Sequence, residues 1–303
     1  MFLARSMDVE IIFLGTGNAM PTAKRAHTAI LLKAGAEKIL VDCGEGTQRQ
    51  LRIAEENPCK LTRILITHLH VDHTLGLPGL LKTLEMSEYQ KTLQIYGPRG
   101  IKRHIEMLAA IYGQFRIKHE VYEILGGKIE EKEFTIEALP MQHTTHTLAY
   151  SFTIKDKRRI DKQKLAKLKI SPSPLLAKLQ HGKAITIEGV KLDPKKLTYL
   201  EKGKKITFIL DTLPNKNAVK IAKDADLVIC EAAFSSKDQA LAASHQHLTS
   251  TQAATIAKQA KATRLLLTHI SQRYEHDLSK IEKEARMLFK NTSVVQDFQK
   301  ITI

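Results

Sequence analysis

Short apolar runs that end in polar residues recur along the whole chain. These runs are rich in Ile, Leu and Val, and several are closed by glycine or proline turns, which is typical of strands. Segments with helical character lie between them. This alternation indicates a layered α/β protein. The runs predict strands at 9–14, 28–32, 38–41, 64–66, 92–97, 134–140, 205–210, 225–231 and 264–268, and helices at 76–86, 100–111 and 250–261.

Two of the apolar runs are almost the same. Arg264–His269 repeats Arg63–His68 nearly residue for residue. Such a repeat is expected if two similar half-domains each present a histidine at the end of a strand to a shared site. His68 and His269 are therefore candidate ligands of one centre.

The strand at 64–66 ends in a cluster of polar residues with metal-ligand character. His68 and His70 are spaced to bind one ion, while Asp72 and His73 face another. Neutral imidazole and carboxylate suit Zn²⁺, and two such ions about 3.5–4 Å apart can clamp a phosphoryl group. Ordinary loop histidines are the alternative, but this spacing directly after a buried strand argues against it.

Four ligands are too few for two ions, so at least one more histidine for each metal and a bridging carboxylate are needed. Asp211 ends the strand at 205–210, where it could reach both ions; the alternative is that it caps the next helix. His143 and His146 both follow the strand at 134–140, and one of them should complete the first site.

These motifs resemble a known family. His-x-His-x-Asp-His after a hydrophobic strand is similar to the signature of the metallo-β-lactamase superfamily, and with Asp42–Thr47 and Leu75–Leu80 the chain resembles ribonuclease Z, the tRNA 3′-processing endonuclease. The resemblance implies a four-layer αβ/βα metallo-β-lactamase fold with an inserted basic arm, and two Zn²⁺ per subunit. The ligands that it implies are His68, His70, His143 and Asp211 for the first zinc, and Asp72, His73, Asp211 and His269 for the second.

The resemblance also implies catalytic roles. His247, in a His-x-Thr sequence at a helix start, is similar to the family's proton donor to the leaving oxygen, whereas His245 matches less well. Asp72 would orient or deprotonate the attacking water. We expect Asp42 to brace the metal loop by a hydrogen bond rather than to bind metal. The acidic partner of His247 is not determined, and Glu231 is one candidate.

Positive charge is concentrated in one segment. The net charge is +15, and from Lys155 to Lys205 there are 16 Lys and Arg against 5 Asp and Glu, so +11 lies in about a sixth of the chain. A solvated helical face is the alternative for any single lysine, but the segment as a whole favours contact with a phosphate backbone. We therefore predict a catalytic domain at 1–154 and 205–303, and an inserted tRNA-binding arm at 155–204.

Ribonuclease Z has a Gly-Pro-rich arm tip and a Pro-x-Lys-x-Arg-Asn loop, and both are matched here only in part. Pro172 and Pro174 remain, with serines in place of the glycines, so whether this tip grips tRNA is open. A short amphipathic helix is predicted at 161–169. The candidate RNA contacts are Lys24 and Arg25 in the loop after Pro21, Lys162, Lys164, Lys167 and Lys169 in the insertion, and Arg273, whose alternative is a salt bridge with Glu275 or Asp277.

The chain carries no sign of export or of membrane insertion. No apolar run approaches the ~18 residues of a membrane span, and the first residues lack a signal-peptide core, although Met7 could be the true start. Three cysteines without Cys-x-x-Cys spacing indicate a reducing compartment. We expect a cytoplasmic protein.

The predicted function is a zinc-dependent endoribonuclease that cuts the 3′ trailer from precursor tRNA, leaving a 3′-hydroxyl on the tRNA and a 5′-phosphate on the trailer. The resemblance implies a homodimer. The alternatives are a two-metal phosphodiesterase for small or cyclic-nucleotide substrates, and a non-catalytic RNA-binding protein. The sequence determines neither the metal used in the cell, since Mn²⁺ accepts such ligands, nor whether CCA-containing precursors are cut.

Overall fold

The computed structural model describes residues 8–171, 173–187 and 189–303, and divides the chain into two compact units. Unit 1 comprises residues up to 130 together with 136–152 and 205–303, and unit 2 comprises 131–135 and 153–204. The expectations about Met7 and Pro172 fall outside the described residues. In the described part of the chain, no helix has the length and apolar character needed to cross a membrane.

Unit 1 is built on two seven-stranded sheets, ordered β18-β1-β2-β3-β4-β5-β6 and β17-β16-β15-β14-β9-β8-β7. The first contains β1 (Val9–Gly15), β2 (Ala29–Ala34), β3 (Glu37–Val41), β4 (Arg63–Leu65), β5 (Leu93–Gly97), β6 (His119–Glu123) and β18 (Lys300–Thr302). The second contains β7 (Gly127–Glu130), β8 (Phe134–Met141), β9 (Thr147–Ile154), β14 (Lys205–Ile209), β15 (Leu227–Glu231), β16 (Leu265–Thr268) and β17 (Thr292–Val294).

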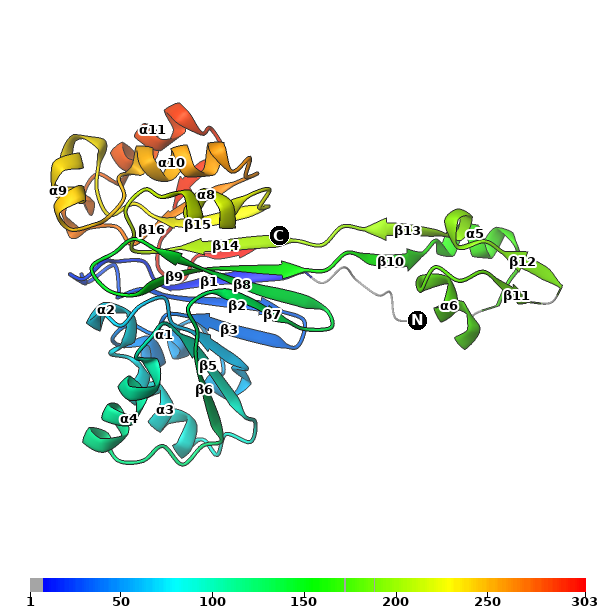
Figure 1. Ribbon diagram of the computed structural model, residues 1–303, viewed down its shortest axis with the longest axis horizontal. Coiled ribbons are helices and arrows are strands. Elements are labelled where there is room, and N and C mark those ends of the chain that lie inside the picture. The colour runs from blue at the N-terminus through cyan, green and yellow to red at the C-terminus, as the bar shows by residue number, and fades with distance from the viewer. Residues whose placement is uncertain (1–7, 172, 188) are drawn as a thin grey trace. The chain divides into compact units, whose positions relative to one another are not determined.

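Helices cover the outer face of each sheet, so unit 1 has four layers, as Figure 1 shows. One apolar cluster joins α1, α3 and α4 to the first sheet, and another joins α8, α10 and α11 to the second. The four-layer αβ/βα architecture predicted from the sequence is confirmed. The helices of unit 1 are α1 (Thr47–Ile53), α2 (Val71–Thr74), α3 (Leu77–Met86), α4 (Ile101–Tyr112), α8 (Lys216–Ala222), α9 (Gln239–Ser244), α10 (Ser250–Gln259) and α11 (Leu278–Leu288), with short 3₁₀ turns at Pro58–Lys60, Ser236–Asp238 and Gln272–Tyr274.

The central strands are buried on both faces. In β1, Ile12 and Leu14 pack against the helices, while Ile11 and Phe13 lie on the other face and are equally inaccessible. Strands covered on both sides have continuous apolar sequences without alternation, which explains the character of the runs. The two sheets are also linked directly, because the buried Tyr150 of β9 donates its hydroxyl proton to the Ile66 carbonyl after β4, at 2.9 Å.

Parallel pairing brings strand ends together. In the first sheet β3, β4, β5 and β6 are parallel neighbours, and in the second β14, β15, β16 and β17 are. Residues that follow the carboxyl ends of neighbouring parallel strands lie at one edge of the sheet, which is where α/β proteins build their sites. Asp211 and His269 follow β14 and β16, and His68 follows β4. The repeated run therefore occupies the equivalent place in each sheet.

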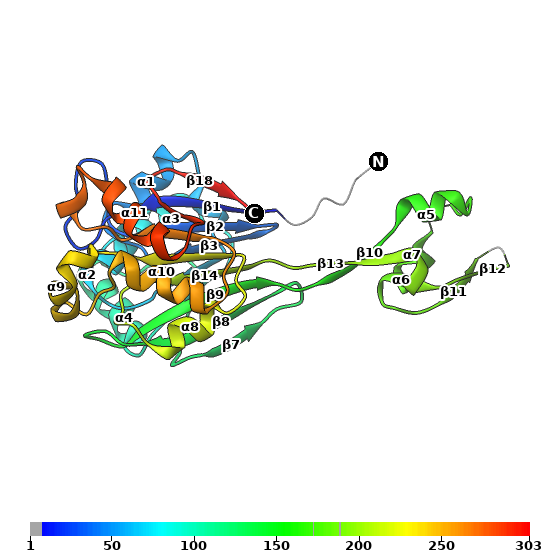
Figure 2. The same ribbon diagram turned by 90° about the horizontal axis from the view of Figure 1, so that it is seen from above.

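Unit 2 has its own small core. The antiparallel strands β10 (Lys157–Ile160) and β13 (Thr198–Glu201) lead to a hairpin of β11 (Ile185–Ile187) and β12 (Val190–Leu192), around which α5 (Lys162–Lys167), α6 (Ala177–Gln180) and α7 (Pro194–Leu197) gather (Figure 2). A 3₁₀ turn at Pro174–Leu176 precedes α6. The buried core residues are Leu165, Ile170, Leu176, Leu179, Leu192 and Leu197. The predicted helix at 161–169 is present but shorter, and the insertion is folded as well as basic.

We expect Leu179→Ala to unfold unit 2 selectively. Leu179 is completely buried in the small core, and a Leu→Ala change at such a position costs roughly 2–5 kcal/mol. Hydrogen exchange followed by mass spectrometry should show reduced protection at 153–204 and unchanged protection in unit 1. The exposed neighbour Lys178 supplies the control, Lys178→Ala, which should leave both regions protected. Loss of protection throughout the chain in Leu179→Ala would show that the two units do not fold independently.

Candidate metal centre

The metal-ligand motif is divided between a loop and one helical turn. His70 has an extended conformation as the N-cap of α2, and the helical turn then carries Asp72 and His73. His68 lies in the loop before it and is fully buried. Because the backbone changes direction here, His68 and His70 belong to one ligand group and Asp72 and His73 to another, as the spacing predicted.

The first group of potential ligands contains His68, His70, His143 and Asp211. His70 Nδ1 lies 3.0 Å from His68 Nε2 and 3.3 Å from His143 Nε2. Asp211 Oδ2 lies 3.5 Å from His68 Nε2 and 3.8 Å from His143 Nε2. Tetrahedral ligands at Zn–N distances of 2.0–2.1 Å would be separated by about 3.3–3.4 Å, so these spacings suit a single ion.

The second group contains Asp72, His73, Asp211 and His269, all of them buried. His73 Nε2 lies 3.3 Å from both His269 Nε2 and Asp72 Oδ2, and Asp72 Oδ2 is 3.4 Å from His269 Nε2. Asp211 Oδ1 is 3.2 Å from His269 Nε2 and 3.5 Å from His73 Nε2. Asp211 thus presents one oxygen to each group.

The Asp211 carboxylate shows that the donor set fits cations. Asp211 is 2% exposed, and its Oδ1 has no hydrogen-bond donor among the described residues. A buried carboxylate oxygen left unpaired is costly, and a bound cation would remove that cost. Imidazole with carboxylate is a ligand combination that suits zinc and similar transition metals better than magnesium or calcium. Both groups could therefore hold a divalent ion.

The protonation states of His68 and Asp211 favour metal binding. Burial, with a contribution from nearby His73, lowers the pKa of His68 well below its usual value, so the ring is neutral. Burial alone would raise the pKa of Asp211, but His269 and His73 outweigh it, so the pKa is lowered and the carboxylate is ionised. Metal ligands must be deprotonated, and both of these residues already are. Burial lowers the pKa of His73, but Asp211 and Asp42 outweigh it and raise the pKa well above its usual value, so His73 must lose a proton when it binds a metal.

Asp42 braces the centre without joining either ligand group. Its Oδ2 is 2.6 Å from His73 Nδ1 and accepts from Thr67 Oγ1 at 2.7 Å, while Oδ1 accepts from the Thr67 amide at 2.7 Å. A hydrogen bond at Nδ1 directs the other ring nitrogen, Nε2, toward the ligand position. His143 is held in the same way, since its Nδ1 donates to the Gln246 carbonyl at 3.0 Å. The expected bracing role of Asp42 is confirmed.

The backbone is strained at two of these positions. Asp42 and His269 have φ values of 57° and 56°, a left-handed conformation uncommon for residues other than glycine. Such strain persists only where the surroundings impose it, and it concentrates at functional sites. Asp42 and His269 directly follow strands β3 and β16, at the ends of those strands that lie next to the site.

Glu231 is the acidic partner of His247, which the sequence left open. His247 Nδ1 lies 3.1 and 3.2 Å from the two Glu231 oxygens, and the Thr212 amide holds one of those oxygens at 2.7 Å. Burial lowers the pKa of His247, but Glu231 and Asp211 outweigh it and raise the pKa to about 9. The following helix α10 starts at a capping box between Thr249 and Gln252, which fixes the chain just after His247.

Two candidate histidines from the sequence are not in the centre. His146 and His245 are exposed and belong to neither ligand group. His245 instead stacks beside Phe234, with ring centroids 6.1 Å apart. Asp211 does not cap a helix, because the N-cap of α8 is Asn215.

The prediction that Arg25 contacts RNA is wrong. Arg25 is 3% exposed, and its Nη1 donates to Thr16 Oγ1 at 2.7 Å and to the Val295 carbonyl at 2.9 Å. The guanidinium therefore ties its loop to the C-terminal segment. The sequence shows that Arg25 lies in a loop, but not that the C-terminal segment crosses over it.

The other predicted RNA contacts are exposed. They are Lys24, Arg273, Lys162, Lys164, Lys167 and Lys169. Arg273 forms no ion pair with any residue between 8 and 303 that the structure describes, so the alternative pairing is absent. Glu275 instead accepts from Thr22, and Asp277 caps α11. Within the described residues, Lys164 forms an ion pair with Asp161, at 3.3 Å on the surface.

Comparison with known proteins gives full-length relatives. The chain is 42% identical to the ribonuclease Z of Nanoarchaeum equitans over 274 residues, which are 89% of this chain and 86% of the relative. It is 34% identical to that of Methanosarcina mazei over 97% of this chain and 98% of the relative, and 38% identical to that of Bacillus mycoides over 97% and 99%. In addition, residues 9–168 match the family described as Anti-Pycsar protein Apyc1.

Solved structures agree on the architecture. Human tRNase Z, short form, is 26% identical, with a TM-score of 0.71 over 96% of this chain and 98% of the human chain. The metallo-beta-lactamase fold protein YhfI from Bacillus subtilis is 20% identical, with a TM-score of 0.73 over 98% and 100%. The similarity to YhfI, at 20% identity, shows the fold alone. The ribonuclease Z relatives are similar in sequence over most of the chain.

We expect Asp42→Ala to weaken metal binding. The change removes the hydrogen bonds that orient His73 and Thr67, and the loss of such a partner typically costs 10–100-fold in metal affinity. Titration of the metal-free protein with Zn²⁺ in a calorimeter would measure the effect. Glu106→Gln, on the exposed side of α4, is the control and should bind like the unaltered protein. Equal affinity in all three would mean that Asp42 has no part in positioning the ligands.

Proposed function

Since the chain belongs to the ribonuclease Z family, we propose that it is a metal-dependent endoribonuclease that removes the 3′ trailer from precursor tRNA. The observation that carries the proposal is Asp211, which faces two ligand groups at once, with the His247–Glu231 pair 3.9 Å from it. The two large sheets and the full-length ribonuclease Z relatives agree with it.

We assign the two groups to two zinc ions. His68, His70, His143 and Asp211 would hold one, and Asp72, His73, Asp211 and His269 the other. Zinc ions held there would lower the pKa of a water molecule and stabilise charge on the phosphoryl oxygens. Asp72 would orient the attacking water, because its Oδ2 lies on the side of the second group that also contains His73 and His269.

His247 supplies the proton for the leaving group. Its Nδ1 is held by Glu231, so Nε2 is the nitrogen that faces the substrate. As the bond from phosphorus to the 3′-oxygen breaks, Nε2–H donates its proton to that oxygen. The tRNA then ends in a 3′-hydroxyl, and the trailer keeps the phosphate at its 5′ end. The raised pKa keeps His247 protonated at neutral pH, as this role requires.

Unit 2 would bind the body of the precursor. Its lysines at 162, 164, 167 and 169 are exposed, and it has few aromatic side chains on which bases could stack. Double-stranded RNA is recognised mostly by shape and by backbone contacts, which suits such a surface.

We further propose a cytoplasmic homodimer. Exposed apolar side chains of α4, namely Met107, Ile111 and Tyr112 at 53%, 68% and 52% exposure, support an interface there.

Cleavage of a 3′-extended precursor tRNA, with bis(p-nitrophenyl) phosphate assayed alongside, tests the function. We expect a cut immediately after the discriminator base, abolished by a chelator and restored by Zn²⁺. The position is found by sequencing the products. Hydrolysis of the small ester without any cut in the RNA would support the rival function, a two-metal phosphodiesterase for small substrates.

We expect Glu231→Gln to shift the pH dependence of cleavage. The glutamine keeps the acceptor for the Thr212 amide but removes the charge that raises the pKa of His247. A proton donor is active in its protonated form, so activity is lost as pH rises through its pKa. The basic limb of the kcat profile should therefore move to lower pH in Glu231→Gln. An unmoved basic limb would remove Glu231 from this role.

We expect His247→Ala to bind the precursor normally and to cleave it at least 10²-fold more slowly, because general acid catalysis contributes about 10²–10⁴.

We expect replacement of Lys162, Lys164, Lys167 and Lys169 by Gln to flatten the salt dependence of precursor binding. Removing one lysine that neutralises a phosphate lowers the slope of log K against log [salt] by up to about 1. Binding of the precursor to His247→Ala, with and without these four changes, would be followed by fluorescence anisotropy over a range of KCl concentrations. Replacement of Lys216, Lys220, Lys258 and Lys261 in unit 1 is the matched control. An equal slope with the unit 2 lysines intact or replaced would exclude them as phosphate contacts.

A further inference from the structure

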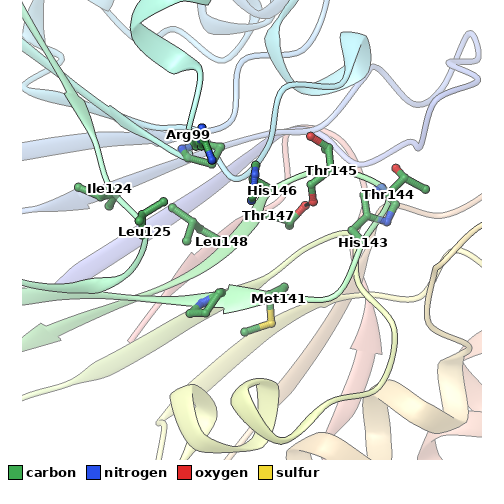
Figure 3. A pocket seen from close by; sticks show the side chains of 12 residues that line it. Arg99, Ile124, Leu125, Met141, His143, Thr144, Thr145, His146, Thr147 and Leu148 are labelled. Carbon is green, nitrogen blue, oxygen red and sulfur yellow. Dashed lines mark hydrogen bonds between the residues drawn. The ribbon is translucent and has the colours of Figure 1, made fainter.

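A cavity of about 500 Å³ adjoins the candidate metal centre (Figure 3). His143 and Thr144 lie at one end, and Ile124 and Leu125 lie at the other. Its size falls within the 300–1,000 Å³ typical of small-molecule sites. Apart from the proposed metal ligand His143, none of the proposed metal ligands or catalytic residues lines it, so the reaction described above does not account for it.

One loop connects this cavity to the ligands. Thr144 Oγ1 lies 3.1 Å from His70 Nε2, and His146 lines the cavity two residues further on. Three residues span at most about 11 Å, so His143 and His146 are close enough for adjacent parts of one substrate to touch both. A group bound in the cavity would thus lie directly beside the phosphate that is cut.

The polar side of the cavity can bind an anion. Arg99 and His146 are both exposed, and neither side chain has a hydrogen-bond or ion-pair partner in the described part of the chain. The described lining residues include no Asp or Glu. Glu123 lies close by, but it accepts from the Gly100 amide at 2.8 Å. A guanidinium with no partner, beside a histidine and three threonines, suits a phosphate group.

The remaining wall is apolar, which a bare anion would not require. Ile124, Leu125, Met141 and Leu148 line it, and Leu125 is 69% exposed although it is a leucine. A ligand with a flat apolar part and a phosphate would use both walls. An unpaired RNA nucleotide has both parts, and its base can stack on His and Arg side chains, both of which line this cavity.

We propose that this cavity holds the unpaired nucleotide next to the scissile phosphate, with its phosphate on Arg99 and His146 and its base against Leu125 and Ile124. This inference rests on the proposed function, since it assumes an RNA substrate. The proposal makes Arg99 and His146 substrate-binding residues that hold the RNA strand beside the metal centre. Such a site selects a position along the RNA and not a particular base, because its contacts are to a phosphate and to the apolar face of a base.

Competition with mononucleotides tests the cavity directly. Inhibition constants of uridine 5′-monophosphate and of inorganic phosphate would be measured against bis(p-nitrophenyl) phosphate hydrolysis by the zinc-loaded protein. We expect Arg99→Ala to raise the inhibition constant of the nucleotide at least about ten-fold, the effect of one hydrogen bond to a charged group. Leu125→Ala should also raise the constant for the nucleotide, because the base loses its apolar contact, and should leave that for phosphate unchanged. Arg103→Ala, on α4 outside the cavity, is the matched control. Thermal unfolding and zinc content establish that each variant is folded and loaded.

The outcomes separate this inference from the proposed function. If the unaltered protein cuts precursor tRNA and Arg99→Ala raises both the nucleotide constant and the KM for the precursor, both stand. If the unaltered protein cuts the precursor but the nucleotide constant is the same in Arg99→Ala, the cavity inference is overturned and the function stands. If no precursor is cut but the nucleotide constant still rises, the cavity binds nucleotides and the assignment to tRNA is overturned.

Discussion

The buried carboxylate of Asp211 is the constraint on which the rest of this structure depends. It is almost inaccessible, it is ionised, and one of its oxygens has no hydrogen-bond donor in the described residues. A buried anion is destabilising unless it is compensated, so the surroundings must supply positive charge or hydrogen-bond donors. Histidines from both sheets surround it, and a pair of cations between them would balance the charge. The same arrangement that makes the centre costly without metal makes it suited to bind two ions.

Geometry at the strand ends makes this arrangement possible. Parallel strands in both sheets release the chain at the same edge, and Asp42 and His269 adopt left-handed backbone conformations there. Asp42, Gln246 and Glu231 then hold the rings of His73, His143 and His247 in place through their Nδ1 atoms. Oriented side chains need little reorganisation when a substrate arrives, which is how electrostatic preorganisation accelerates a reaction. The candidate metal ligands and His247 are thus held by one set of hydrogen bonds.

Unit 2 is folded despite its large excess of positive charge. A chain segment with a large excess of positive charge repels itself and would remain unfolded without apolar residues to bury. Unit 2 overcomes this with six buried aliphatic side chains, and its lysines stay on the surface. The cavity beside His143 adds a further polar surface in unit 1, lined by Arg99 and His146. In the proposed reaction, the two surfaces would act on different parts of the RNA.

Much of this protein could be predicted from local sequence. The apolar runs placed most of the central strands, and the His-x-His-x-Asp-His motif with the repeated run before His269 identified the residues that the structure brings together, because ligands at strand ends leave a local signature. The short strands at the sheet edges, β6, β7, β17 and β18, were not predicted, because short pairings at an edge have little local pattern. The longer inner strand β9 was not predicted either. Only the tertiary structure decided the rest. It buried Arg25 beneath the C-terminal segment, placed Glu231 on His247, gave unit 2 a core and opened the cavity at Arg99. Each of these depends on contacts between residues distant in sequence, and the residue pattern around any one position does not record which distant segment will pack against it.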